Sequence, residues 1–390
     1  MIEALWTFPA IIIAALIIAW AAECGQFYIS QGLALAVLAW VQTLPEFAVE
    51  AAIALEAAKD PEKVHLMTAN FTGSLRLFVG LGWPMVYFVA FAFSKTKKVW
   101  DREFGFWEIV MEDEQSIAVI SLLPTLFYFS IIYLKGSLTW VDGVILACIY
   151  FGYLWLLSKM PPQESEGVSD LGFVPRWVMS RPRAQSLTAI GVLFVIGAMI
   201  LWFCAHPFLD SMLAIAVTVG MSQFVFVQWV APFLSEFPEK LSAFHWAKTV
   251  KKAPMALSNF VSSSINQWTI LVATVPFIYA FGLGQLNGGF MHFQPIIFDE
   301  HQKTEVLLTI VQSYLGFVFL ASLTFAFPEA LGLFVLWIIQ FFVPDVREEI
   351  IWVYGGWAAI ETVRMIIHYK KKNAFHVFKA LVQSHLFKRA

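Results

Sequence analysis

The sequence has little charge and few cysteines for its length. Only 14% of its 390 residues are charged, whereas 59% are hydrophobic and the mean hydropathy is +0.71. A single soluble core of this length cannot bury so much apolar surface. The scarcity of charge therefore excludes an ordinary soluble protein and indicates that lipid is part of the solvent.

Several functional classes are excluded by residues that the sequence does not have. The three cysteines, Cys24, Cys148 and Cys204, are too far apart for a metal-ligand spacing or a disulfide framework. No basic stripe interleaved with aromatic residues offers a nucleic-acid surface, and the net charge is −3. No nucleophile–base pair or histidine cluster indicates an enzyme, and no cofactor is expected. The N-terminus lacks the positive flank of a signal peptide, so the first apolar run should be retained.

Apolar runs long enough to cross a bilayer recur along the whole chain. Runs this long and this uniformly apolar satisfy their backbone hydrogen bonds in lipid only as helices. We predict an all-α polytopic membrane protein with about eleven transmembrane helices. The predicted spans lie near residues 5–23, 29–57, 64–94, 116–134, 138–158, 187–205, 212–243, 254–282, 306–326, 329–343 and 349–369.

Lysine and arginine in the connecting segments predict the orientation of these spans. With the N-terminus outside, the inner segments 95–104, 159–186, 240–252 and 370–390 carry 18 of them, and the outer segments carry five. We therefore expect an integral protein of a bacterial inner (plasma) membrane, with the N-terminus outside and the C-terminus cytoplasmic.

Three short matches recur in the same order in the two halves of the chain. Residues 43–46 (Thr-Leu-Pro-Glu) match 236–239 (Glu-Phe-Pro-Glu) at an offset of 193. Asn70-Phe71 matches Asn259-Phe260 at an offset of 189, and Asp113-Glu114 matches Asp299-Glu300 at 186. Since an odd number of spans separates the copies, they must be inverted relative to each other.

We therefore predict two inverted five-helix repeats and an additional C-terminal helix. The predicted boundaries are 1–158 for the first repeat, 159–186 for a cytoplasmic linker, 187–345 for the second repeat, and 346–390 for the extra helix and a basic cytoplasmic tail.

The paired glutamates Glu46 and Glu239 are the main candidates for function, because a carboxylate deep in an apolar span is costly. Helical spacing places Gln42, Thr43 and Glu50 on the face of Glu46. Ser235 and Glu236 stand in the same relation to Glu239. A proline before each glutamate interrupts the helix and leaves backbone carbonyl oxygens without a helical donor. Hard cations such as Ca²⁺ bind carbonyl oxygens together with carboxylates and hydroxyls.

A second polar line occurs one helix later in each copy. Asn70 and Ser74 are four residues apart, and Asn259, Ser263 and Gln267 repeat this spacing. These residues are either further cation ligands or polar contacts between helices.

Two basic residues lie close to these motifs. Arg76 points some 200° around the helix from Ser74, which favours a partner on another helix. Lys240 follows Glu239 directly and is either an ion-pair partner or a snorkelling loop residue.

These motifs resemble those of the cation/Ca²⁺ exchanger superfamily over the first ten helices. Its repeats each carry a Gly-Thr-Ser-Leu-Pro-Glu element and, one helix later, a Gly-Asn-x-x-Gly-Ser-Asn element. The first copy here has Val-Gln-Thr-Leu-Pro-Glu at 41–46 and Ala-Asn-Phe-Thr-Gly-Ser-Leu at 69–75. The second has Leu-Ser-Glu-Phe-Pro-Glu at 234–239 and Ser-Asn-Phe-Val-Ser-Ser-Ser at 258–264.

The resemblance implies that Glu46 and Glu239 are the central ligands of a transported cation. The full expected set is Glu46, Glu239, Thr43, Gln42, Ser74, Asn70, Ser235, Glu236, Ser263, Asn259 and Gln267. Four positions depart from the family pattern: Gln267 matches a site that is often acidic, Phe78 replaces an amide, Gln42 a threonine and Glu236 a serine. These departures leave ion selectivity and stoichiometry open.

The implied function is secondary antiport of Ca²⁺ against Na⁺ by alternating access, in which the first and sixth helices slide against a fixed bundle. The same carboxylates also suit protons, because desolvation favours their neutral form, so an H⁺-coupled exchanger is an alternative. A membrane scaffold that kept the fold and lost transport is another. The expected partners are therefore Ca²⁺, Na⁺ or H⁺ and the lipid bilayer.

Overall fold

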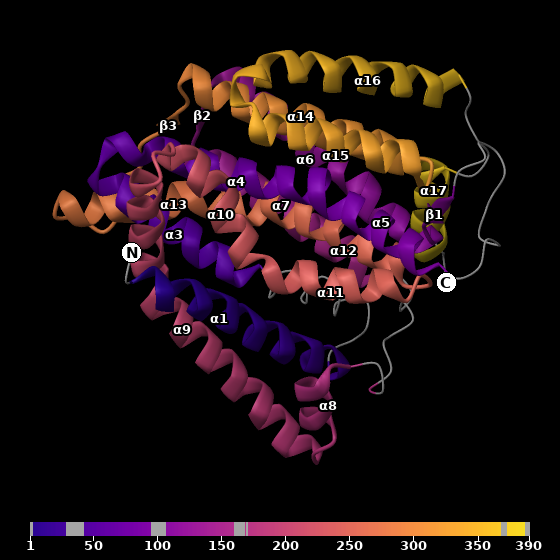
Figure 1. Ribbon diagram of the computed structural model, residues 1–390, viewed down its shortest axis with the longest axis horizontal. Coiled ribbons are helices and arrows are strands. Elements are labelled where there is room, and N and C mark those ends of the chain that lie inside the picture. The colour runs from indigo at the N-terminus through magenta and orange to yellow at the C-terminus, as the bar shows by residue number, and fades with distance from the viewer. Residues whose placement is uncertain are drawn as a thin grey trace. The chain divides into compact units, whose positions relative to one another are not determined.

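The computed structural model confirms an all-α architecture (Figure 1). It describes residues 3–28, 43–94, 107–159, 168, 171–367 and 373–386. The chain divides into two compact units, each of which draws on both predicted repeats. Unit 1 comprises Met1–Asn70, Leu154–Glu239 and Phe277–Phe293, and unit 2 comprises Phe71–Tyr153, Lys240–Pro276 and Gln294–Ala390. The predicted boundaries between repeats, linker and tail remain a prediction.

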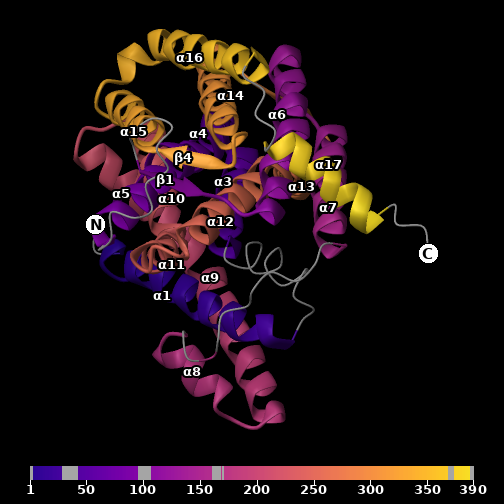
Figure 2. The same ribbon diagram turned by 90° about the vertical axis from the view of Figure 1, so that its right-hand side faces the viewer.

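Unit 1 is built around the helices α1 (Ala4–Gly25) and α9 (Arg183–Thr218), which lie side by side (Figures 1 and 2). Gly197 permits this close approach, because a Cβ there would lie 2.5 Å from Cγ1 of Ile18. The unit also contains η1 (Gln26–Tyr28), α3 (Leu44–Lys59), η2 (Pro61–Lys63), α8 (Phe173–Met179) and α10 (Gln223–Ser235). Helix α3 packs against α1, α9 and α10.

Unit 2 is built around α14 (Glu300–Leu320), which packs against α6 (Ser116–Lys135) and α16 (Arg347–Ile367) (Figure 2). It also contains the π-helices η3 (Phe78–Gly82) and η6 (Gln267–Leu271), and α5 (Trp83–Phe93), η4 (Asp113–Gln115), α12 (Ala253–Asn266), α15 (Phe327–Phe342), η7 (Pro344–Val346) and α17 (Ala374–Leu386). Four helices contribute to both units: α4 (Val64–Leu77), α7 (Trp140–Ser158), α11 (Phe237–Lys248) and α13 (Val272–Leu286).

Eight helical stretches of the described chain are long and apolar enough to cross a membrane. They are 4–25, 61–93, 113–135, 140–158, 183–218, 253–286, 300–320 and 347–367, and α10 and α15 are shorter apolar helices. Large apolar side chains on them face outward, including Trp202 (81% exposed) and Leu134 (80%), as lipid-facing residues do. An integral membrane protein is thus confirmed, whereas its orientation stays a prediction. Segments 29–42 and 95–104 and part of the tail lie outside the described residues.

The predicted spans 187–205 and 212–243 are wrong in their boundaries. Helix α9 continues through His206 and Pro207 to Thr218, and residues 223–248 are divided into α10 and α11. The predicted spans leave residues 206–211, which include His206, Pro207 and Asp210, as a break between two helices. In an apolar setting, however, an interrupted backbone costs more than a proline inside a helix. Ser211 also donates its hydroxyl to the carbonyl of Pro207 (2.7 Å), so this polar side chain is satisfied inside the helix.

Two short strand pairs, which the sequence analysis did not predict, connect the repeats within unit 2. Strand β1 (Glu108–Val110) pairs antiparallel with β4 (Thr324–Ala326), with Ile109 opposite Phe325. Strand β2 (Ser137–Leu138) pairs antiparallel with β3 (Ile296–Ile297). In the first repeat β1 precedes α6 and β2 follows it, and in the second repeat β3 precedes α14 and β4 follows it. The two strand pairs are therefore equivalent, because exchanging the repeats converts the β1–β4 pair into the β3–β2 pair. The predicted span 306–326 is therefore displaced: α14 starts at Glu300 and ends at Leu320, before β4.

The inverted repeat is also visible in local backbone geometry. The π-helices η3 and η6 begin at Phe78 and Gln267, which are separated by the same offset of 189 as Asn70 and Asn259. Single π turns inside α-helices frequently occur at functional sites. Their occurrence at equivalent positions shows that the two copies share the distortion as well as the sequence motif.

We expect Gly80→Ala to destabilise unit 2. A Cβ at Gly80, in the π turn of η3, would lie 2.4 Å from Cβ and Cγ of Trp337. Overpacking of this kind costs about 1–3 kcal/mol. The free energy of unfolding in detergent measures the effect. Gly152→Ala on α7 is the control, because a Cβ there meets no heavy atom of the described residues within 4 Å, and equal stability of both variants would contradict the prediction.

Candidate cation site

Both Pro-Glu motifs lie at helix starts, and each glutamate is the third residue of its helix. Thr43 caps α3, which begins at Leu44, so Glu46 lies in its first turn. Glu239 holds the same position in α11, which begins at Phe237. Both glutamates are 1% exposed. A helix N-terminus favours a negative charge. Both carboxyl groups therefore lie at the end of a helix where the backbone favours negative charge.

Glu50 adds a further buried carboxylate one turn after Glu46 on α3. Its Oε2 accepts a hydrogen bond from Nδ2 of Asn70 (2.6 Å), and both side chains are 0% exposed. Among the described residues, no hydrogen-bond partner reaches Glu50 Oε1 or Asn70 Oδ1. These two buried oxygens belong to unit 1, as Glu46 does. Glu50 lies on the predicted face of Glu46, although it is not a member of the predicted ligand set.

The second copy departs from the continuous helix that the sequence suggested. Helix α10 ends at Ser235, Glu236 caps it, and α11 starts one residue later. The expectation that Ser235 and Glu236 share one helical face with Glu239 is therefore wrong, because Pro238 cannot extend the hydrogen-bond ladder of α10. Ser235 donates to the carbonyl of Ala231 (3.0 Å). Glu236 is 2% exposed, so it too is a buried acid of unit 1.

Apart from Asn70, the second polar line lies in unit 2, where two of its members contact each other. Ser74 on α4 donates its hydroxyl to Oε1 of Gln267, the first residue of η6, over 2.7 Å. Ser263 (0% exposed) and Asn259 (6%) are buried on α12. The contact joins equivalent helices of the two repeats. For Ser74 and Gln267, this hydrogen bond supports the second alternative, a polar contact between helices.

The predicted ligands thus fall into two groups. Unit 1 holds Thr43, Glu46, Asn70, Ser235, Glu236 and Glu239, and unit 2 holds Ser74, Asn259, Ser263 and Gln267. Gln42 lies outside the described residues. In the described part of the chain, no three His, Cys, Asp or Glu side chains are arranged to hold a metal ion by themselves. A transported cation would therefore need hydroxyl, amide or carbonyl oxygens beside the carboxylates.

Arg76 has side-chain partners on other helices, as its direction on α4 predicted. It forms a buried ion pair with Glu305 of α14, whose other carboxylate oxygen contacts Arg347 of α16. Nη1 of Arg76 also donates to Oε1 of Gln340 (3.1 Å), and Gln312 donates to the Arg76 carbonyl (3.1 Å). Sequence reasoning missed Glu305 and Arg347. Both residues are close to the ends of predicted spans, where a charged side chain is ordinarily expected to be exposed to water.

Lys240 is part of helix α11 and is 6% exposed. Its ammonium lies 5.1 Å from the ring centroid of Phe78. The alternative of a snorkelling loop residue is therefore wrong. Phe78 packs in turn on Phe260 of α12, with ring centroids 5.3 Å apart.

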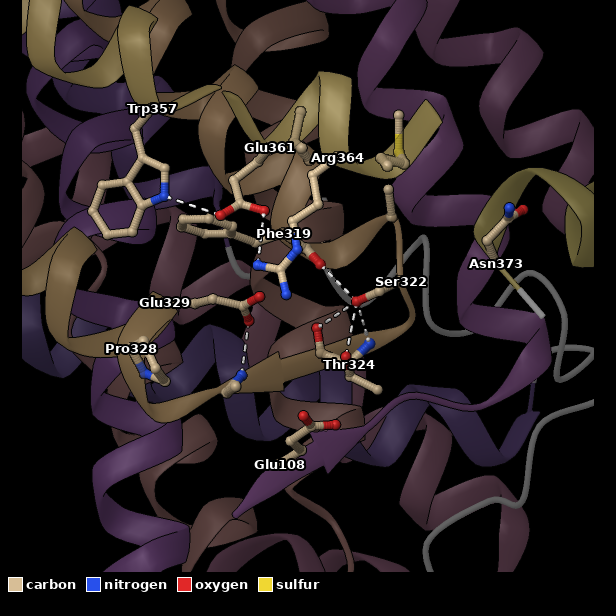
Figure 3. Close-up of a pocket in the computed structure, with 14 residues that line it drawn as sticks. Glu108, Phe319, Ser322, Thr324, Pro328, Glu329, Trp357, Glu361, Arg364 and Asn373 are labelled. Carbon is tan, nitrogen blue, oxygen red and sulfur yellow. Dashed lines mark hydrogen bonds and ion pairs between the residues drawn. The ribbon is translucent and has the colours of Figure 1, made fainter. Parts of the chain in front are cut away.

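A separate pocket of about 230 Å³ lies in unit 2, lined by side chains from β1, α14, β4, α15 and α16 (Figure 3). Its carboxylates have structural partners: Glu329 accepts a hydrogen bond from the Ala326 amide (2.8 Å), and Glu361 lies 3.6 Å from Arg364. None of the described lining residues belongs to the predicted ligand set.

The comparisons with known proteins identify the family. Residues 4–159 and 190–344 match the sequence profile described as sodium/calcium exchanger protein. The chain belongs to this family. The matched ranges contain both Pro-Glu motifs and end before α16. This exchanger is therefore a cation transporter of the cation/Ca²⁺ exchanger superfamily, and the family consists of transporters rather than enzymes.

Solved structures show the same fold in two exchangers. The crystal structure of the H⁺/Ca²⁺ exchanger CAX has 29% sequence identity and a TM-score of 0.86, and the match covers 99% of this chain and 92% of that one. The sodium-calcium exchanger NCX_Mj, soaked with Na⁺ and Sr²⁺, has 19% identity and a TM-score of 0.55, with 87% and 97% covered. The second likeness shows the fold alone. No curated protein sequence matches the chain.

Proposed function

We propose that this exchanger moves Ca²⁺ across the membrane in exchange for protons, by alternating access. The observation that carries the proposal is the set of acids buried in unit 1: Glu46, Glu50, Glu236 and Glu239 are each 2% exposed or less. Buried carboxylates are costly unless a cation or a proton neutralises them. Ca²⁺ supplies two charges when it is bound, and protons take its place when it leaves.

Substitutions in unit 2 favour protons over Na⁺ as the counter-ion. The family resemblance suggests an amide at Phe78 and an acid at Gln267, so this chain has fewer oxygen ligands for additional sodium ions. Glu50 and Glu236 provide further acids in unit 1 instead, and a carboxylate is the group that carries a proton. The H⁺/Ca²⁺ exchanger CAX, similar to this chain over nearly its whole length, supports the same choice.

The helix pair of unit 1 suits the expected movement. Helices α1 and α9 correspond to the first and sixth predicted spans, and they contact each other along their length. Thr7 of α1 donates to Ser211 of α9 (3.4 Å). We expect the pair to move together when the site changes sides.

Exchange of Ca²⁺ for Na⁺ is the second candidate function, and one observation favours it. The hydroxyl positions of the family pattern are kept and buried: Thr43 is 1% exposed, Ser235 is 2% and Ser74 is 0%. Hydroxyl and carbonyl oxygens at such positions can coordinate a sodium ion.

Purified protein in liposomes tests the proposal. We expect Ca²⁺ uptake to follow an imposed pH gradient with no Na⁺ present, and a Na⁺ gradient at equal pH on both sides to drive little uptake. The opposite pattern would establish Na⁺/Ca²⁺ exchange. Absence of uptake under both gradients, in protein that is folded and inserted, would support the scaffold alternative. Liposomes without protein provide the background leak.

A further inference from the structure

Helix α8 carries exposed aromatic side chains in a segment that the sequence predicts as a polar linker. Phe173 is 87% exposed and Trp177 is 52% exposed. The helix lies beside the first turns of α9 within unit 1 (Figures 1 and 2). Aromatic side chains next to the end of a membrane span are typical of the zone between lipid headgroups and acyl chains. This surface of α8 therefore suits the membrane interface better than open water.

A groove of about 530 Å³ lies between α8 and α9. Side chains of α8, among them Trp177, line one side, and α9 lines the other side from Ala184 to Leu193. This stretch of helix is about 14 Å long, which is close to the depth of one leaflet of the hydrocarbon core. Among the described lining residues only Gln185 and Thr188 are polar, and the Thr188 hydroxyl donates to the Ala184 carbonyl (2.9 Å). The groove therefore has the length and the apolar lining that suit an acyl chain.

Two arginines place positive charge beside this groove. Cζ of Arg181 lies 4.5 Å from the ring centroid of Trp177, which lines the groove. Arg183 directly precedes the lining residue Ala184, and its Cζ lies 5.9 Å from the ring centroid of Tyr28. No Asp or Glu occurs in the sequence from 171 to 209, and within the described residues both guanidinium groups have aromatic partners but no carboxylate partner. The charge at this end of the groove is therefore complementary to an anion.

We propose that this groove binds one anionic phospholipid, with an acyl chain in the groove and the phosphate at Arg181 and Arg183. A guanidinium group binds phosphate oxygens in pairs and can stack on an aromatic ring at the same time. Each basic residue near an anionic membrane surface also strengthens the attraction. The site goes beyond the proposed ion exchange and does not depend on it. It lies on α9, one helix of the pair that is expected to move.

Titration of defined lipids into the purified protein in detergent tests the proposal. Native mass spectrometry counts the bound lipid, and the midpoint of thermal unfolding rises with a ligand that binds the folded state. We expect the wild type to bind dioleoyl phosphatidylglycerol at least about tenfold more tightly than dioleoyl phosphatidylcholine, whose headgroup has no net charge. The double variant Arg181→Gln, Arg183→Gln should bind both lipids equally. Lys248→Gln is the matched control and should keep the preference, because Lys248 is also exposed and lies 5.0 Å from an aromatic ring but does not line the groove.

Ala189→Phe tests the acyl part of the site and decides the matter if the double variant does not fold. Ala189 lies midway along the α9 side of the groove, so a phenyl ring there takes the place of the chain and should weaken phosphatidylglycerol binding at least about tenfold. Equal affinity of the wild type for both lipids, an unchanged preference in the arginine variant, a lost preference in Lys248→Gln, or unchanged binding by Ala189→Phe would each overturn the proposal. Glycerol 3-phosphate that binds as tightly as phosphatidylglycerol would do so too, because it would show a site for a free phosphate ester instead of a lipid.

Discussion

Glu46→Gln and Glu239→Gln are each expected to abolish Ca²⁺ exchange. Both glutamates are buried in the first turn of a helix, and glutamine keeps their size while removing the charge that holds a divalent cation. Loss of an outer partner of a metal site typically costs 10–100-fold, so loss of a central carboxylate should lower the uptake rate by about 100-fold or more. Initial rates of Ca²⁺ uptake into liposomes under a pH gradient measure the effect.

Glu56→Gln is the matched control, because Glu56 lies on α3 with Glu46 but near its far end. Its carboxylate contacts Lys63 (2.9 Å) and Lys59 (3.4 Å) at a partly exposed position. Exposed pairs contribute about 0–1 kcal/mol, so this variant should transport and fold as the wild type does. Full transport by Glu46→Gln, or equal losses in Glu46→Gln and Glu56→Gln, would exclude Glu46 as a ligand.

The features that sequence alone could predict depend on local chemistry. Proline cannot continue a hydrogen-bond ladder, so the break between α10 and α11 at Pro238 results from the residue type, and Pro45 lies at the start of α3 for the same reason. Asp299 and Gln302 cap α14 through two hydrogen bonds of 2.7 and 3.0 Å, as expected for the acidic start of a helix. The recurrence of such local signals at a nearly constant offset also made the inverted repeat predictable.

The features that sequence could not predict depend on contacts between distant segments. The π turns at Phe78 and Gln267 have no residue signature, and the pairing of β1 with β4 joins segments some 200 positions apart. The interhelical direction of Arg76 could be derived from helical geometry. Its partner Glu305, 229 positions away, could not. Likewise, Lys240 could be placed over an aromatic ring only once the helices were packed.

Glu305→Gln is expected to have the largest effect on stability. Glu305 is fully buried on α14 and contacts two guanidinium groups, Arg76 of α4 and Arg347 of α16. Removing one partner of a buried ion pair costs about 3–5 kcal/mol, because the remaining charge stays desolvated without it. Here one substitution removes the counter-charge of both arginines. The free energy of unfolding in mixed detergent micelles is the quantity to measure.

Glu300→Gln on the same helix is the control that removes an exposed charge instead of a buried one. Glu300 pairs with Lys303 at 2.7 Å, but its side chain is 91% exposed, so its loss should change stability by less than about 1 kcal/mol. The double variant Arg76→Met, Glu305→Gln should be less destabilised than the sum of its single variants, since each side chain is costly mainly when the other is missing. Additive effects would instead mean that Arg76 and Glu305 act independently.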